Sequence, residues 1–131
     1  MLAHDLQALE QIVAARGRFG HREHLELAWT YLSRYRLERA TDAMSAAITH
    51  LASEHGMPDR YHDTITRSWV QLVDVHRRGN DARSFDEFIA SNLGLLDRQL
   101  LARHYSAELI ASAGARAEWT EPDLRPLPGL R

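Results

Sequence analysis

The chain has 131 residues, enough for a single domain built around one hydrophobic core. Its 16 basic residues nearly balance 18 acidic ones, and the formal net charge of -2 gives no strong field toward nucleic acid or an anionic membrane surface. Cysteine is absent and every basic residue is arginine, which excludes cysteine nucleophiles, disulfides, iron–sulfur clusters and attachment of pyridoxal phosphate (PLP) to a lysine.

Helical periodicity dominates the first part of the chain. Apolar residues recur at spacings of three and four, and Ala and Leu outnumber Val and Ile, so the sequence predicts an all-α fold. A first helix is expected over Asp5–Arg16, where Gly17 ends it, and a second helix begins at His21. The third helix is expected over Leu37–His55, where Gly56 ends it.

The middle of the chain predicts a fourth long helix and several shorter ones. Pro58 breaks the chain after the third helix, and Asp59 is the expected N-cap of the fourth. Ser84 and Glu87 have the spacing of a capping box, which opens a short helix. Leucines between residues 95 and 101 favour a further helix, and Ser106 is the expected cap of a last one.

The C-terminal segment departs from this pattern, because prolines at 122, 126 and 128 prevent a helix. We therefore expect a single-domain helical bundle over residues 1–113, with four longer helices and short C-terminal ones. An extended, proline-rich arm or tail is expected over residues 114–131.

Apolar runs in the sequence are too short for a membrane span, which needs roughly 18 uninterrupted apolar residues. Asp5 and Glu10 lie where a signal peptide would be apolar. No predicted helix has the basic surface of a DNA-recognition helix. We expect a cytoplasmic protein that binds neither membrane nor nucleic acid.

Histidines are the most informative chemical feature. If the four long helices run up and down, the starts of the second and fourth lie at the same end as the finish of the third. His21 and His24, three residues apart, share a helix face, and His62 lies near the start of the fourth helix. These three imidazoles are therefore expected to meet in one cleft, where Glu54 can join them from the third helix.

Such a set would satisfy a divalent transition metal, zinc or iron, and leave a position for water or substrate. The sequence thus predicts a small metal-dependent enzyme that acts on a small organic substrate. Its metal ligands would be His21, His24 and His62, and its catalytic residues would be His62 and Glu54. The expected substrate contacts are Trp29, Tyr61, Thr66 and Trp69.

Three alternatives stay open. Helix N-termini and nearby arginines (Arg16, Arg18, Arg22 and Arg60) favour an anion, so a neutral histidine could act as general base without a metal on a substrate held by arginine. Trp29, Tyr31 and Tyr35 could instead anchor a homodimer with no enzymatic activity. Most of the histidines could also be structural.

Several segments resemble a group of small, uncharacterised bacterial proteins of similar length. The likeness lies in F-x-H-x-x-H-L at Phe19–Leu25, A-W-x-Y-L at Ala28–Leu32 and Y-H-x-T-I-T at Tyr61–Thr66, with further pieces at 105–108, 115–116 and 122–123. This resemblance implies an all-helical body and draws attention to His21, His24 and His62, but it implies neither a substrate nor a cofactor.

Overall fold

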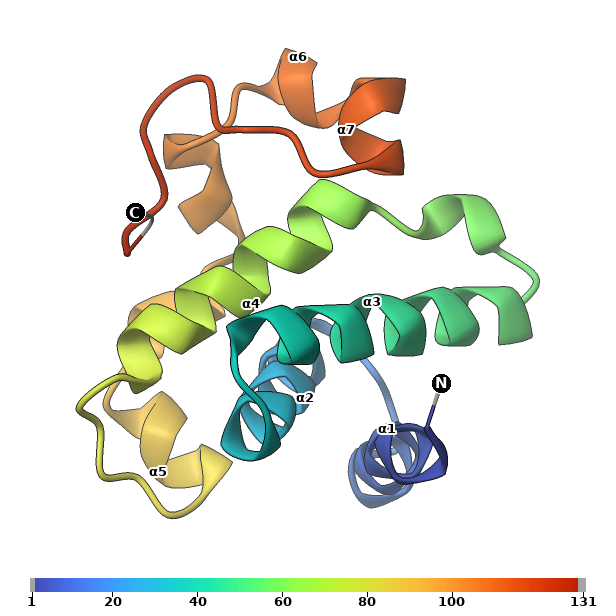
Figure 1. Cartoon of the computed structure of the whole chain (residues 1–131), viewed down its shortest axis with the longest axis vertical. Coiled ribbons are helices and arrows are strands. Elements are labelled where there is room, and N and C mark those ends of the chain that lie inside the picture. The colour runs from blue at the N-terminus through green and yellow to red at the C-terminus, as the bar shows by residue number, and fades with distance from the viewer. Residues whose placement is uncertain (1, 130–131) are drawn as a thin grey trace.

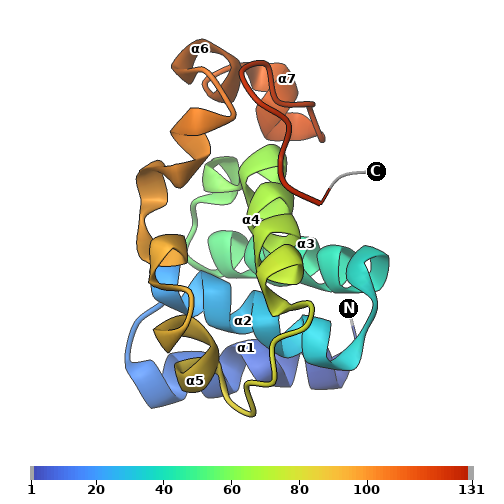
Figure 2. The ribbon, with the colours of Figure 1, turned by 90° about the vertical axis from the view of Figure 1, so that its left-hand side faces the viewer.

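A computed structural model describes residues 2–129 of the chain, and its fold is all-α, as the sequence predicts. Four long helices form the body (Figure 1): α1 (Ala3–Arg16), α2 (His21–Arg34), α3 (Leu37–Glu54) and α4 (Asp63–Arg77). Helices α2, α3 and α4 pack against one another, and α1 packs on α2 and α3. Figure 2 shows α1 at one end of the molecule and the C-terminal helices at the other.

The core follows the helical periodicity of the sequence. Leu9 of α1, Leu25 of α2 and Met44 of α3 are each at most 2% exposed. Tyr31 is completely buried among them, and its hydroxyl donates a hydrogen bond of 2.7 Å to the backbone oxygen of Asp5. Tyr31 is therefore a core residue and not the dimer anchor of the alternative hypothesis.

The turn after α3 differs from the prediction. Residues Pro58–Arg60 form a short 3-10 helix, η1, and α4 begins only at Asp63, so Asp59 is not its cap. The N-cap is His62, whose Nδ1 accepts a hydrogen bond of 3.1 Å from the backbone nitrogen of Ile65. An imidazole nitrogen thus does here what a Ser or Asp oxygen does at most helix starts.

The second half of the chain consists of short elements: α5 (Phe85–Ala90), η2 (Leu93–Leu96), η3 (Arg98–Arg103), α6 (Ala107–Ile110) and α7 (Ala113–Ala117). Ser84 and Ser106 cap α5 and α6 as predicted. The helix expected from the leucines between residues 95 and 101 is instead two 3-10 turns, because Asp97 interrupts it and accepts the backbone N–H of Gln99.

The C-terminal arm lies on the body. Residues 114–117 belong to α7, so the extended part starts later than the predicted boundary at 114. The buried Thr64 hydroxyl of α4 contacts the backbone oxygens of Ala115 and Glu118, at 2.6 and 2.9 Å, and accepts the N–H of Thr120. Leu127 is 2% exposed.

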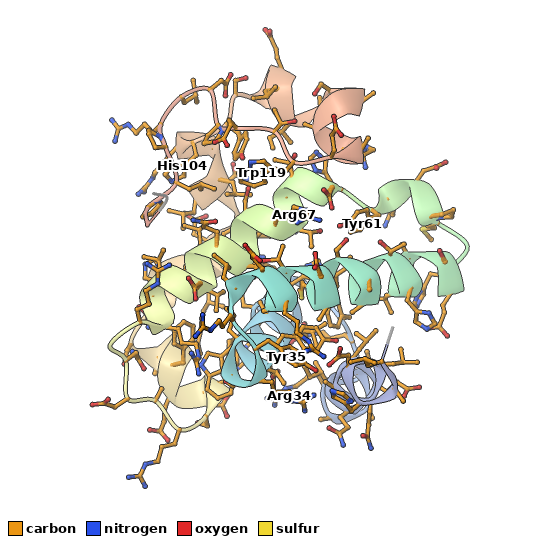
Figure 3. All side chains as sticks on the ribbon, in the orientation of Figure 1. Arg34, Tyr35, Tyr61, Arg67, His104 and Trp119 are labelled. Carbon is orange, nitrogen blue, oxygen red and sulfur yellow. The ribbon has the colours of Figure 1, made fainter. Side chains whose placement is uncertain are left out.

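The end of the arm is equally well fixed. His104 holds it through hydrogen bonds to the backbone of residues 124 and 125 (Figure 3). Gly129 has a positive φ of 75° and lies so close to Val75 that a side chain would collide with it. No helix between residues 2 and 129 is long and apolar enough to cross a membrane.

Candidate functional site

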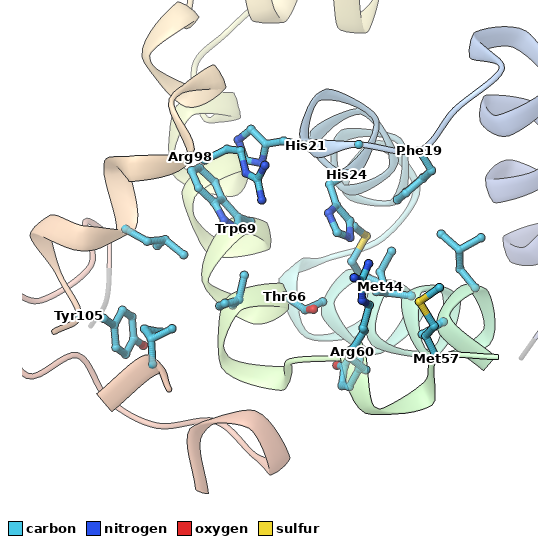
Figure 4. A pocket seen from close by; sticks show the side chains of 18 of the residues that line it. Phe19, His21, His24, Met44, Met57, Arg60, Thr66, Trp69, Arg98 and Tyr105 are labelled. Carbon is cyan, nitrogen blue, oxygen red and sulfur yellow. The ribbon is translucent and has the colours of Figure 1, made fainter. Parts of the chain in front are cut away.

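A cavity of about 780 Å³ lies where α2, α3, η1, α4, η3 and α6 meet (Figure 4). Its wall is largely apolar: Met44, Ile48 and Leu51 come from α3, and Leu101 comes from η3. Aromatic side chains complete the wall, with Phe19 before α2 and Trp69 on α4. The volume and the apolar wall are typical of pockets that enclose a small organic molecule.

His24 is the central polar group of this pocket. Its buried Nε2 has no hydrogen-bond partner among the described residues. The ring lies edge-on to Phe19, with centroids 5.1 Å apart. Burial, aided by His21 and by the positive charge of Arg98, lowers the pKa of His24 to about 4. The imidazole is therefore neutral at pH 7 and has an unused nitrogen.

His21, one turn earlier on α2, is held more firmly. Its Nε2 donates a hydrogen bond of 2.9 Å to the backbone oxygen of Leu95, and its ring packs against Trp69 with centroids 4.5 Å apart. Burial lowers the pKa of His21 as well. Because Nε2 carries the proton, the free lone pair of the neutral ring lies on Nδ1.

Two arginines supply the fixed charge of the pocket. Arg60 extends from η1 toward His24, and Arg98 lies at the start of η3 beside His21 and Trp69 (Figure 4). No Asp or Glu is among the described residues that line the cavity. Within residues 2–129, neither arginine forms an ion pair with a carboxylate.

Three of the arginines that the sequence suggested for anion binding lie outside the cavity and close to carboxylates. Arg16 pairs with Glu26 at 3.1 Å, and Arg22 pairs with Asp86 at 2.6 Å. The nearest carboxylate to Arg18 is the buried Glu23, at 3.8 Å. Of the four arginines that the sequence suggested for anion binding, only Arg60 lines the cavity.

The tyrosine hydroxyls near the cavity are already used. Tyr61 lies at the seam between α3 and α4 (Figure 3), where its hydroxyl donates to Asp63 at 2.5 Å and contacts Ser45 at 2.7 Å. Burial, followed by the hydrogen bond to Asp63, raises the pKa of Tyr61 to about 12. Tyr105 donates to the backbone oxygen of Thr120. Tyr61 and Tyr105 therefore line the cavity with their rings, and their hydroxyl groups are not available as acids.

Five of the predicted site residues do line this cavity: His21, His24, Tyr61, Thr66 and Trp69. Three do not, namely Trp29, Glu54 and His62. Trp29 packs against Phe85 of α5, with ring centroids 6.4 Å apart. Glu54 is an exposed residue that pairs with His50 at 3.1 Å.

His62 does not join His21 and His24. Its Nδ1 caps α4, and its Nε2 donates a hydrogen bond of 2.7 Å to the backbone oxygen of Ile110. With both nitrogens engaged in backbone hydrogen bonds, the ring has no lone pair for a metal. In the part of the chain that the structure describes, no three histidine or carboxylate side chains are grouped as a metal site. The predicted three-histidine ligand set is therefore not assembled.

Arg98 is a charged residue of the cavity that the sequence did not indicate. It lies in a segment whose leucines dominated the prediction, and nothing in its spacing connects it with His21. The only signal was its position directly after Asp97, which caps η3 and accepts the backbone N–H of Gln99.

Comparisons with protein-family models, with curated proteins and with solved structures found no match for this chain.

Proposed function

We propose that this pocket binds a small organic molecule with an apolar body and an anionic head group, and that His24 exchanges a proton with it without a metal. The observation that carries the proposal is the buried Nε2 of His24, which faces no protein partner in the described chain. A buried polar atom without a partner costs free energy, and a ligand that hydrogen-bonds to Nε2 would remove this cost.

The wall of the cavity supports the apolar part of the ligand. Trp69 and Met44 line the cavity and are packed into the core, at 6% and 1% exposed, so the apolar wall is held in place by the fold. A bound hydrocarbon or aromatic body would displace water from this surface, which is the main source of affinity in pockets of this kind.

The arginines support the anionic part. A guanidinium donates paired hydrogen bonds to carboxylate or phosphate oxygens and stays charged at any physiological pH. Because Arg60 and Arg98 border a cavity whose described lining has no carboxylate, their charge is available to a ligand.

His24 supports the chemistry. Its neutral ring can donate or accept at Nε2 once a ligand is present. An anionic group beside the ring stabilises the imidazolium and raises the pKa of His24 from about 4 toward neutrality. A proton taken from one atom of the ligand can then be returned to another atom, which requires no co-reactant.

Three naphthalenes of one shape test the proposal: the 2-carboxylate, the neutral 2-carboxamide and the cationic 2-methylamine. We expect calorimetry to give an affinity about tenfold higher for the carboxylate than for the amide, and no binding of the amine. Arg60→Gln and Arg98→Gln should each remove most of this preference. Arg103→Gln is the matched control, since Arg103 lies on the same 3-10 helix as Arg98 but outside the cavity.

Nuclear magnetic resonance of the histidine rings provides the second measurement. Binding of the carboxylate should shift the resonances of His24 and leave those of His50 unchanged, because His50 lies outside the cavity. Equal affinities for the three compounds, or a carboxylate that binds equally to the Arg60 and Arg98 variants, would refute the proposal.

A further inference from the structure

We propose that the head group of the ligand carries two negative charges on one group, as a phosphate monoester or a phosphonate does. This inference rests on the proposed function of the pocket and narrows its ligand class.

The charge of the lining favours a dianion. Among the described residues around the cavity, the only permanently charged side chains are the guanidinium groups of Arg60 and Arg98. The two imidazoles on α2, His21 and His24, are neutral at pH 7. Among the side chains that a ligand can contact in the cavity, a monoanion would therefore meet two positive charges, whereas a dianion matches both.

Two carboxylates lie near the histidine pair but outside the cavity: the charge of Asp97 raises the pKa of His21 and that of Glu23 raises the pKa of His24, each against the larger effect of burial. Glu23, buried on α2, accepts the backbone N–H of Gly20 at 2.8 Å and lies 3.8 Å from Arg18. Asp97 accepts the backbone N–H of Gln99 at 2.9 Å. Neither residue lines the cavity.

The position of the donors favours one head group. Arg60 and Arg98 come from two separate 3-10 helices, and in Figure 4 one reaches toward His24 and the other lies beside His21. Arg98 lies beside His21, and its positive charge lowers the pKa of both imidazoles. Arg60 and Arg98 thus border the histidine pair from two separate elements, with Arg60 toward His24 and Arg98 beside His21.

The number of donors favours a head group with three oxygens. Each guanidinium can offer two parallel N–H groups, and neutral His24 can offer one more at Nε2. A carboxylate has two oxygens for these donors, whereas a phosphonate or a terminal phosphate has three. Three oxygens allow both arginines and His24 to be satisfied together.

The backbone on both sides of Arg60 is held by hydrogen bonds. Its neighbours on both sides are held by Arg116 of α7, whose Nη1 donates to the backbone oxygen of Asp59 at 3.0 Å and contacts that of Tyr61 at 3.4 Å. This segment is therefore tied to α7, which lowers the entropy cost of ordering Arg60 against a ligand.

The test compares naphthalene-2-phosphonate with naphthalene-2-sulfonate, which have the same ring, the same tetrahedral head group and the same number of oxygens. At about pH 8.5 the phosphonate carries two charges and the sulfonate one. We expect the phosphonate to bind about tenfold tighter or better. Arg60→Gln and Arg98→Gln should each reduce this ratio to near one, whereas Arg103→Gln should preserve it.

The outcomes separate this inference from the proposed function. If the sulfonate and the carboxylate bind in an arginine-dependent way but the phosphonate binds no tighter, the dianion is wrong and the anion pocket stands. If naphthalene-2,6-dicarboxylate binds tighter than the phosphonate, the two charges belong at opposite ends of the ligand and the single head group is wrong. If none of these anions binds, both proposals fail.

Discussion

The imidazole of His24 lies edge-on to the ring of Phe19, with the two centroids 5.1 Å apart, and none of the described residues offers a partner to its buried Nε2. His24 therefore lowers the stability of the unliganded protein, because its ring packs against an apolar group and its Nε2 lacks a hydrogen bond. Such sites are common where a protein exchanges stability for binding.

Replacement of His24 should show this cost directly. We expect His24→Leu to raise the free energy of unfolding at pH 7 by about 1 kcal/mol, because an apolar side chain removes the unsatisfied nitrogen. The same variant should lose binding of naphthalene-2-carboxylate. Urea denaturation and calorimetry measure the two effects, and a destabilised variant that still binds would contradict both parts.

The low pKa of His24 predicts how stability depends on pH. The pKa is about 4 in the folded protein and near 6.5 in the unfolded chain, so between these values the unfolded chain binds more protons. The free energy of unfolding should therefore rise between about pH 4 and pH 6.5 and level off above. The rise from His24 alone is at most about 3 kcal/mol. His24→Leu should flatten this part of the curve, and an unchanged slope would argue against the shift.

His62 should behave as a structural cap. We expect His62→Ala to lower the free energy of unfolding by about 1–2 kcal/mol, because the N–H of Ile65 and the carbonyl of Ile110 both lose their partner. His62→Asn should recover part of the loss, since an Asn oxygen also caps a helix well. Equal stability of the Ala variant and the wild type would rule out the cap, and loss of ligand binding in a fully folded Asn variant would assign His62 to the site after all.

Site residues on one helix were predictable from the sequence, whereas those that depend on the conformation of a turn were not. His21 and His24 share a helix face and reach the cavity, because helical spacing alone fixes which residues lie together on one helix. Whether His62 joins them depends on the turn before α4. That turn is a 3-10 helix over Pro58–Arg60, and it moves the N-cap from the expected Asp59 to His62.

The long helices were predictable for the same reason. Glycine at the end of α1 and the serine caps of α5 and α6 are local signals, and they lie where expected. The two 3-10 turns over residues 93–103 were not predictable, since leucines at similar spacing fit an α-helix equally well. Arg98 was missed with them.

Thr64 should control the C-terminal arm. Its hydroxyl contacts the backbone at residues 115, 118 and 120, and the residue is completely buried. We expect Thr64→Val to destabilise the fold by about 1–3 kcal/mol, because these backbone groups lose a partner, and to increase hydrogen exchange over residues 118–124. Thr64→Ser keeps the hydroxyl and should change neither. Unchanged exchange in the Val variant would show that the arm is held elsewhere.

Removal of metal should not affect the pocket. Since His62 is occupied by backbone hydrogen bonds, we expect ethylenediaminetetraacetate to leave the affinity for naphthalene-2-carboxylate unchanged. Elemental analysis after dialysis against zinc or iron gives a second readout. Retained metal that is lost in His24→Leu would instead restore the metal hypothesis.

A homodimer and a cytoplasmic location stay predictions, which sedimentation and cell fractionation would test.

The hydrogen bonds from Arg116 to the backbone of Asp59 and Tyr61 join α7 to the turn that carries Arg60. We therefore expect a change at Arg116, which lies outside the cavity, to loosen the backbone that carries Arg60. Under the proposed function, variation in α7, none of whose residues lines the cavity, would change ligand affinity through the position of Arg60.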